Sequence, residues 1–64
     1  MNGEEEQEFL TVAQIARKLQ VSKNLVYFWI KSGQLRAYRV GNQTTRVRFD
    51  DLERFLKERR TEEF

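Results

Sequence analysis

The chain of 64 residues contains neither cysteine nor histidine. This composition excludes disulfide bonds, zinc fingers, thiol nucleophiles and imidazole bases. The absence of cysteine is also typical of a cytoplasmic protein, because structural disulfides belong to oxidising compartments. Proline is absent as well, and the only glycines are Gly3, Gly33 and Gly41.

Long apolar runs are also missing. The longest uninterrupted one, "LVYFWI", has six residues, whereas a bilayer span needs roughly 20. The chain begins "MNG" and then turns acidic, which does not match a signal peptide. At this length we expect one domain with a small core. We place that domain at residues 9–60, between a disordered acidic segment at 1–8 and a frayed tail at 61–64.

Negative charge is absent from the centre of the chain. Residues 9–49 have a net charge of +8, whereas residues 1–8 carry −4 and residues 50–64 carry −2. A block of one sign repels itself unless a polyanion neutralises it, and DNA or RNA is the usual polyanion. A basic surface that serves only solubility is the alternative, but helix signals and aromatic residues are interleaved with the charges. The positive residues of the block are Arg17, Lys18, Lys23, Lys31, Arg36, Arg39, Arg46 and Arg48.

Two helix starts lie close together near the N-terminus. Thr11 is a good N-cap and Gln14 completes a capping box, which predicts a first helix. That helix ends before Gln20, and Ser22 is already the next N-cap. Such a short connection is typical of a helix-turn-helix, in which Val21 can pack between the two helices.

The second helix is predicted over residues 23–31, with Gly33 as the left-handed residue after its end. Its apolar residues gather on one face, and its polar residues lie on the other together with two aromatic residues. The inward face holds Val26, Trp29 and Ile30, with Leu25 at its border. The outward face holds Asn24, Tyr27, Phe28 and Lys31, with Lys23 at its edge.

From residue 35 to residue 49 the hydrophobic period changes to 2, which predicts a two-stranded hairpin around the turn "GNQT". In its second strand, Val47 and Phe49 are expected on one face, and Arg46 and Arg48 on the other. The apolar face must rest on the helices, because an isolated hairpin is only marginally stable.

Asp50 and Glu53 form a second capping box, which predicts a third helix. Leu52, Phe55 and Leu56 share one face of this helix. The resulting order is helix, tight turn, helix, hairpin and helix. This is the layout of a winged helix-turn-helix, so the predicted fold class is α+β.

The stretch "FLTVAQIARKLQVSKNLVYFWIKSGQLRAYRVG" resembles the small helix-turn-helix proteins of the excisionase type, which are similar to the N-terminal DNA-binding part of MerR-type regulators. The matching features are "FLTV", the "VS" turn, a Tyr in the second helix, "SGQL", "RVG" and "DDLERFL", over about residues 9–57. The resemblance implies sequence-selective DNA binding, with the second helix in the major groove and the wing on the backbone or minor groove. Carried over by position, the contacting residues are Ser22, Lys23, Asn24, Tyr27, Lys31, Arg39 and Arg46.

The residue types at these positions agree with that role. Lys23 and Asn24 can bind guanine and adenine edges, and they lie in the first turn of the second helix. Ser22 offers a hydroxyl and a helix N-terminus to a phosphate, although it also serves as a plain N-cap. The Tyr27 hydroxyl can reach a phosphate, unless the ring packs against the hairpin.

Other cations extend the expected interface. Arg39, Arg46 and Arg48 alternate along the hairpin, which predicts one guanidinium-rich face. Protection of an exposed strand edge by charge is the alternative. Arg17 and Lys18 lie on the outer half of the first helix, where they either touch the DNA backbone or are solvated.

The second helix departs from the family pattern. Leu25 and Phe28 stand where short polar or basic residues are common. Phe28 is placed well for the methyl group of a thymine, or it begins an apolar patch for a second protein. Trp29 replaces a common aliphatic residue and is expected in the core. The turn "GNQTT" lacks the Trp or basic residue often found there.

The sequence does not support catalysis, and no enzyme, metal or cofactor is expected. Its carboxylates are better explained as helix caps and tails, and no P-loop or dinucleotide fingerprint is present. The first hypothesis is an excisionase-type architectural factor that binds directly repeated sites, bends the DNA and biases an integrase toward excision. The chain ends soon after the third helix, whereas a MerR-type regulator would continue into a dimerisation helix. A stand-alone MerR-like transcription regulator and a protein-interaction module that uses Phe28 are the alternatives.

One recognition helix covers only a few base pairs, which predicts cooperation between copies on DNA. No heptad helix for a symmetric dimer is visible. Because the ends are acidic and the centre is basic, adjacent copies can contact one another head to tail. We therefore expect a monomer in solution that loads cooperatively on direct repeats.

Overall fold

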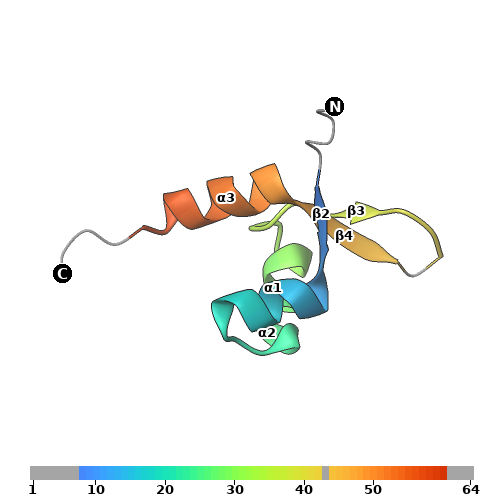
Figure 1. Ribbon diagram of the computed structural model, residues 1–64, viewed down its shortest axis with the longest axis horizontal. Helices are drawn as coiled ribbons and strands as arrows, with labels where there is room; N and C mark the ends of the chain where they lie inside the picture. The colour runs from blue at the N-terminus through green and yellow to red at the C-terminus, as the bar shows by residue number, and fades with distance from the viewer. Residues whose placement is uncertain (1–7, 43, 61–64) are drawn as a thin grey trace.

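The computed structural model describes residues 8–42 and 44–60. Three helices and a three-stranded antiparallel sheet form an α+β winged helix-turn-helix, as predicted (Figure 1). The predictions for residues 1–7 and 61–64 lie outside the described residues. The elements, in chain order, are β2 (Phe9–Thr11), α1 (Val12–Leu19), α2 (Lys23–Lys31), β3 (Tyr38–Arg39), β4 (Thr45–Arg48) and α3 (Phe49–Glu58).

The helix-turn-helix forms through the predicted capping groups. The Thr11 hydroxyl accepts a hydrogen bond from the Gln14 backbone N–H at 2.9 Å, and the Gln14 side chain accepts one from the Thr11 N–H at 2.8 Å. The Ser22 hydroxyl accepts from the Leu25 N–H at 3.1 Å. Between the helices, Gln20 adopts a left-handed φ of 59°, which ends α1 and redirects the chain within two residues. The capping box and the tight turn are therefore confirmed.

The sheet contains one more strand than the predicted hairpin. Its order is β2-β4-β3, so the strand that precedes α1 pairs with the far edge of the hairpin. In the β2–β4 register, Phe9 faces Arg48 and Leu10 faces Val47. The sequence did not reveal β2, because three residues are too few to show an alternating pattern. Pairing with β4 supplies the hydrogen-bond partners that this short segment lacks by itself.

The first strand of the hairpin is shorter than predicted, since β3 contains only Tyr38 and Arg39. Leu35, which was expected at the start of that strand, lies in the connection after α2 and is 1% exposed. Its backbone N–H donates to the Trp29 carbonyl at 3.1 Å, which satisfies an acceptor at the end of α2. Gly33 has a φ of 82°, which confirms the predicted left-handed position.

The predicted cap of α3 is wrong. The helix begins at Phe49 with Arg48 as its N-cap, and no side chain caps it. Asp50 and Asp51 instead lie inside the first turn, where carboxylates are favourable near the positive end of the helix. The helix starts early because β4 runs directly into it, and the Phe49 N–H donates to the Glu8 carbonyl at 2.9 Å.

One apolar core joins the helices, the sheet and the connection after α2. Trp29, expected in the core, is half-buried at its edge and lies against Phe55 with ring centroids 4.8 Å apart. Leu56, expected on the buried face of α3, is 39% exposed. The buried residues are Val12, Ile15, Ala16, Val26, Leu35, Val47, Leu52 and Phe55.

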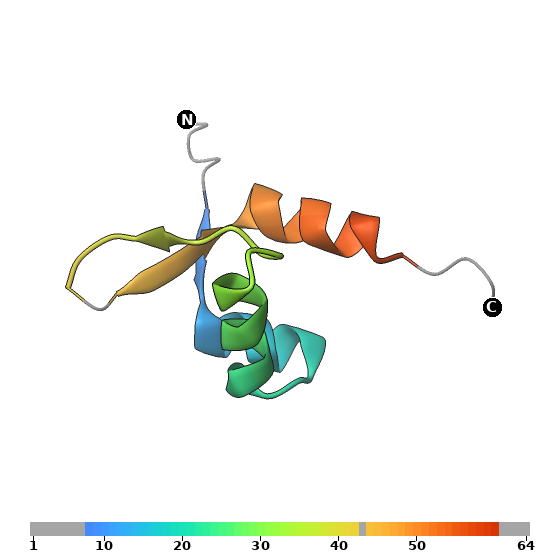
Figure 2. The same cartoon turned by 180° about the vertical axis from the view of Figure 1, so that it is seen from behind.

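The three parts of the fold point in different directions. The β3–β4 wing and α3 extend to opposite sides of the molecule, with α1 and α2 below the sheet in both views (Figures 1 and 2). Within the ranges that the structure describes, no helix combines the length and apolarity that a membrane crossing requires. The arrangement leaves the outward side of α2 and one side of the wing uncovered by α3.

Candidate nucleic-acid interface

The outward face of α2 is open along its whole length. The buried side chain of Val26, 0% exposed, fixes which side of the helix faces the core. Trp29 and Ile30 pack on the same side as Val26, as predicted. All five residues predicted to face outward are exposed, namely Lys23, Asn24, Tyr27, Phe28 and Lys31.

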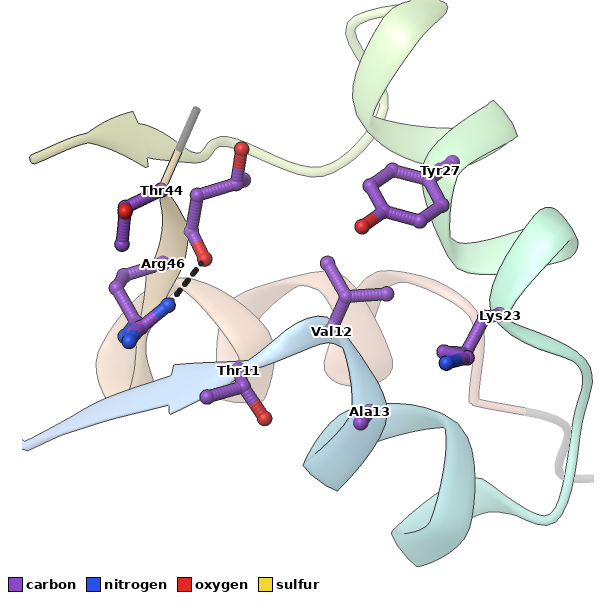
Figure 3. A pocket seen from close by; sticks show the side chains of 8 residues that line it. Thr11, Val12, Ala13, Lys23, Tyr27, Thr44 and Arg46 are labelled. Atoms are coloured by element: carbon purple, nitrogen blue, oxygen red, sulfur yellow. Dashed lines mark hydrogen bonds between the residues drawn. The ribbon is translucent and has the colours of Figure 1, made fainter. Parts of the chain in front are cut away.

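An open hollow of ≈ 280 Å³ connects α2 to the wing (Figure 3). Lys23 and Tyr27 reach it from α2, and Arg46 reaches it from β4, with Val12 between them (Figure 3). None of the described residues that line the hollow is acidic. The lining residues are Thr11, Val12, Ala13, Lys23, Tyr27, Thr44, Thr45 and Arg46.

Tyr27 and Arg46 both line this hollow and carry hydrogen-bond donors. The Tyr27 ring is 46% exposed and its hydroxyl points into the hollow (Figure 3). Arg46 donates from Nη1 to the backbone carbonyl of Thr45 at 3.1 Å, which holds one side of the guanidinium near the wing backbone. A guanidinium has five N–H donors, so this single hydrogen bond leaves others for an anion. Both side chains can therefore contribute phosphate contacts.

Sequence reasoning missed the threonines of the wing. Thr44 and Thr45 line the hollow beside Arg46, and their hydroxyls are of the type that binds phosphate oxygens. The only signal in the sequence was their position next to Arg46. Thr11, which the sequence indicated only as a helix cap, reaches the same hollow from β2, the strand that pairs with β4.

The wing arginines do not share a single face, which corrects the predicted guanidinium-rich face. In the β3–β4 register Tyr38 pairs with Arg46, and Arg39 pairs with Thr45. Residues that pair directly across an antiparallel ladder point to the same face, and neighbours along a strand alternate. Arg46 and Arg48 therefore lie on one face of the sheet, and Arg39 lies on the other.

Arg48 is engaged within the protein. Its guanidinium lies 3.8 Å from a carboxylate oxygen of Asp50. Its hydrogen bond to the Tyr38 hydroxyl, followed by that from Arg36, lowers the pKa of Tyr38, and the same Tyr38 contact raises the pKa of Arg48. The Tyr38 ring packs edge-on against Phe9, with centroids 6.1 Å apart. Arg48 thus contacts β3 and the first turn of α3.

The remaining predicted residues are dispersed. Arg17 and Lys18 are exposed in the last turn of α1, where they line a different open hollow with Leu10 and Gln14. Ser22 is exposed, and its hydroxyl caps α2. The structure therefore brings Lys23, Tyr27 and Arg46 together and leaves Arg17 and Lys18 elsewhere.

Comparison with known families identifies this arrangement. Residues 9–60 match the family model described as "Helix-turn-helix domain". The chain belongs to this family. It includes excisionase-like small DNA-binding proteins, so the resemblance seen in the sequence is confirmed. No curated protein and no solved structure matches the chain.

Family membership, together with the fold, establishes the general activity. The chain is a sequence-specific DNA-binding protein of the helix-turn-helix type, and its ligand is double-stranded DNA. The family points to a binding role rather than an enzymatic one. In this fold, the second helix of the pair is the recognition helix.

Proposed function

We propose that this helix-turn-helix protein places α2 in the major groove and rests its wing on the adjoining phosphate backbone or minor groove. The observation that carries the proposal is the hollow in which Lys23 and Tyr27 of α2 face Arg46 of the wing. Cations from two separate elements border one open space, and residues 9–49 contain no carboxylate to compete for them. A backbone phosphate of a duplex that docks over this space supplies the missing negative charge.

The first turn of α2 supplies the base contacts in this arrangement. Lys23 is of the type that binds guanine, and Asn24 is of the type that binds adenine through two hydrogen bonds. Both are exposed at the N-terminal end of α2, the end that approaches base edges in this class of domain. Ser22 and the helix N-terminus lie close enough in sequence to orient a neighbouring phosphate.

The backbone contacts come from both sides of the recognition helix. We assign Tyr27, Lys31 and Arg46 to phosphates beside the groove. Arg17 and Lys18 contact the backbone further away, at the end of α1. Arg39, on the opposite face of the wing from Arg46, makes a peripheral contact. Arg48 acts by positioning the wing on α3, because Asp50 and Tyr38 already hold its guanidinium.

The biological role proposed is that of an excisionase-type architectural factor. The family includes excisionase-like proteins. The cations extend over α1, α2 and the wing, which point in different directions (Figure 2). Bending lets one duplex reach all three, and the additional phosphate contacts offset the cost of bending. The protein binds directly repeated sites as a monomer, loads cooperatively head to tail, and biases an integrase toward excision.

Bending and recombination assays test this role. A site selected from a random library is moved along a DNA fragment, and the electrophoretic mobility of the complex is measured at each position. Position-dependent mobility and a shift of an integrase reaction toward excision are expected. A tight dimer without DNA, together with a preference for inverted repeats, would instead favour a stand-alone MerR-like transcription regulator. Failure to bind duplex DNA would favour a protein-interaction module that uses Phe28.

A further inference from the structure

Phe28 is the most exposed of the large apolar side chains on α2. Its relative exposure is 55%, compared with 46% for Tyr27 and 38% for Leu25. Val26 and the residues packed around it complete the core on the opposite side of the helix, so Phe28 contributes nothing to that core. When a ligand covers apolar surface that is exposed in the free protein, the removal of that surface from water favours binding.

The neighbours of Phe28 determine what kind of ligand can cover it. On a helix, residues three and four positions apart lie side by side, which places Asn24 and Lys31 next to Phe28 on the outward face. A partner that buries Phe28 therefore also covers an amide and an ammonium group. An apolar protein surface would remove water from both without replacing the lost hydrogen bonds. The edge of a DNA groove supplies acceptors and phosphates to these polar groups as well as apolar groups to the ring.

We infer that Phe28 reads the 5-methyl group of a thymine in the major groove. The inference rests on the proposed placement of α2 in the major groove and names one further base, a thymine, that α2 recognises there. The thymine methyl is the apolar group that the major groove presents, and contact with Phe is one of the ways in which proteins recognise it. The ring is the most exposed of the large apolar side chains of α2 and lies on the outward face between Asn24 and Lys31, so it meets the methyl when α2 lies in the groove.

The spacing along α2 adds a positional expectation. Phe28 lies four positions after Asn24, which corresponds to roughly 6 Å along the helix axis. Base pairs are spaced by about 3.4 Å. The thymine under Phe28 therefore lies within about two base pairs of the adenine bound by Asn24. The preferred site contains an A·T-rich step at the centre of the contact.

Removal of the methyl group alone provides the sharpest test. A preferred duplex is first selected from a random library with the wild-type protein. Each thymine of that duplex is then replaced by deoxyuridine, which deletes one methyl and keeps base pairing. At one position the affinity should fall about fourfold, the change expected for one methyl that is no longer buried. This measurement needs no protein variant.

A variant and a matched control assign the effect to Phe28. Phe28→Ala should bind the thymine and deoxyuridine duplexes equally at that position. Leu25→Ala, which truncates a neighbouring apolar side chain at the border of the face, should retain the fourfold difference. Equal affinity of the wild type at every replaced thymine, or a difference that persists in Phe28→Ala, would overturn the inference and leave the DNA-binding proposal intact. A library that yields no preferred duplex would overturn both.

Discussion

The two ends of the sheet differ in how their charged side chains are partnered. At the end beside α2, Lys23 and Arg46 face an open hollow with no acidic residue in its described lining. At the end that joins α3, Arg48 contacts Asp50 at 3.8 Å, and Arg54 lies 3.9 Å from Asp51. The first region keeps its cations available for a ligand. The second places its cations beside carboxylates, with Arg48 next to Asp50 where β4 meets α3 and Arg54 next to Asp51 within α3.

Two arginines with the same spacing and sheet face belong to different regions. Arg46 and Arg48 are two positions apart on the same face of β4, and both are half-buried. Their roles differ because one neighbours the hollow and the other neighbours α3. At its other end, α3 is held by Arg59, whose guanidinium lies 3.9 Å from the centroid of the Phe55 ring and donates to the Gln34 side chain. Cations of α3 thus lie beside carboxylates and a ring, whereas no acidic residue is among the described residues that line the hollow beside α2.

The largest expected effect is the salt dependence of DNA binding, which tests the open region as a whole. We expect roughly 4–7 phosphate contacts per monomer, so log K should fall with log salt at a slope of about −4 to −6. Affinity should therefore fall by roughly 10²–10⁴ between 50 mM and 200 mM salt. Titrations of a labelled duplex at four or more salt concentrations measure the slope. A slope near zero would mean that the cations beside the hollow neutralise no phosphates, so the two regions would not differ in their role in DNA binding.

Sequence discrimination should depend on the first turn of α2. Lys23→Ala and Asn24→Ala should each reduce the preference for a specific over a random duplex by about 1–3 kcal/mol, because each removes a proposed base contact. Competition binding with both duplexes measures this preference. Both side chains are exposed, so the melting temperature serves as a control and should change little. Equal losses on specific and random DNA would reassign these residues to the backbone.

Arg46→Ala should weaken binding to all sequences alike and make the salt slope shallower by about one, because a phosphate contact is lost. Its melting temperature should stay close to that of the wild type. Lys57→Ala is a matched control, since it removes one exposed cation from α3, the helix that extends away from the wing (Figure 1). A large fall in the melting temperature of Arg46→Ala would mean that the arginine stem belongs to the core.

Arg48→Ala should have the smallest effect on the salt slope and should instead lower the melting temperature. The substitution removes the contacts to Asp50 and Tyr38, which connect the wing to α3. Asp50→Ala, combined with Arg48→Ala in a double-mutant cycle, measures how much of the effect passes through this pair. An unchanged melting temperature with a shallower slope would place Arg48 with Arg46 at the DNA.

Local signals account for what the sequence predicted correctly. The capping box at Thr11, the cap at Ser22 and the left-handed Gly33 each depend on residues within about one helical turn. The inward side of α2 followed from its periodicity in the same way. The predicted Asp50 cap was wrong because β4 continues directly into α3. The helix therefore begins at Phe49, and Asp50 lies inside its first turn.

The sequence by itself determined the helix pair, the two-faced second helix and the acid-free block of cations. Periodicity, capping and charge depend on residues that are close in sequence, so they can be predicted without knowledge of the fold. Tertiary structure alone decided that Phe9–Thr11 becomes a strand and that Arg39 faces away from Arg46. It also decided that Arg48 lies beside Tyr38 of β3 whereas Arg46 borders the hollow. Pairing between distant segments sets the register of a sheet, and the register decides on which face of the sheet each cation lies.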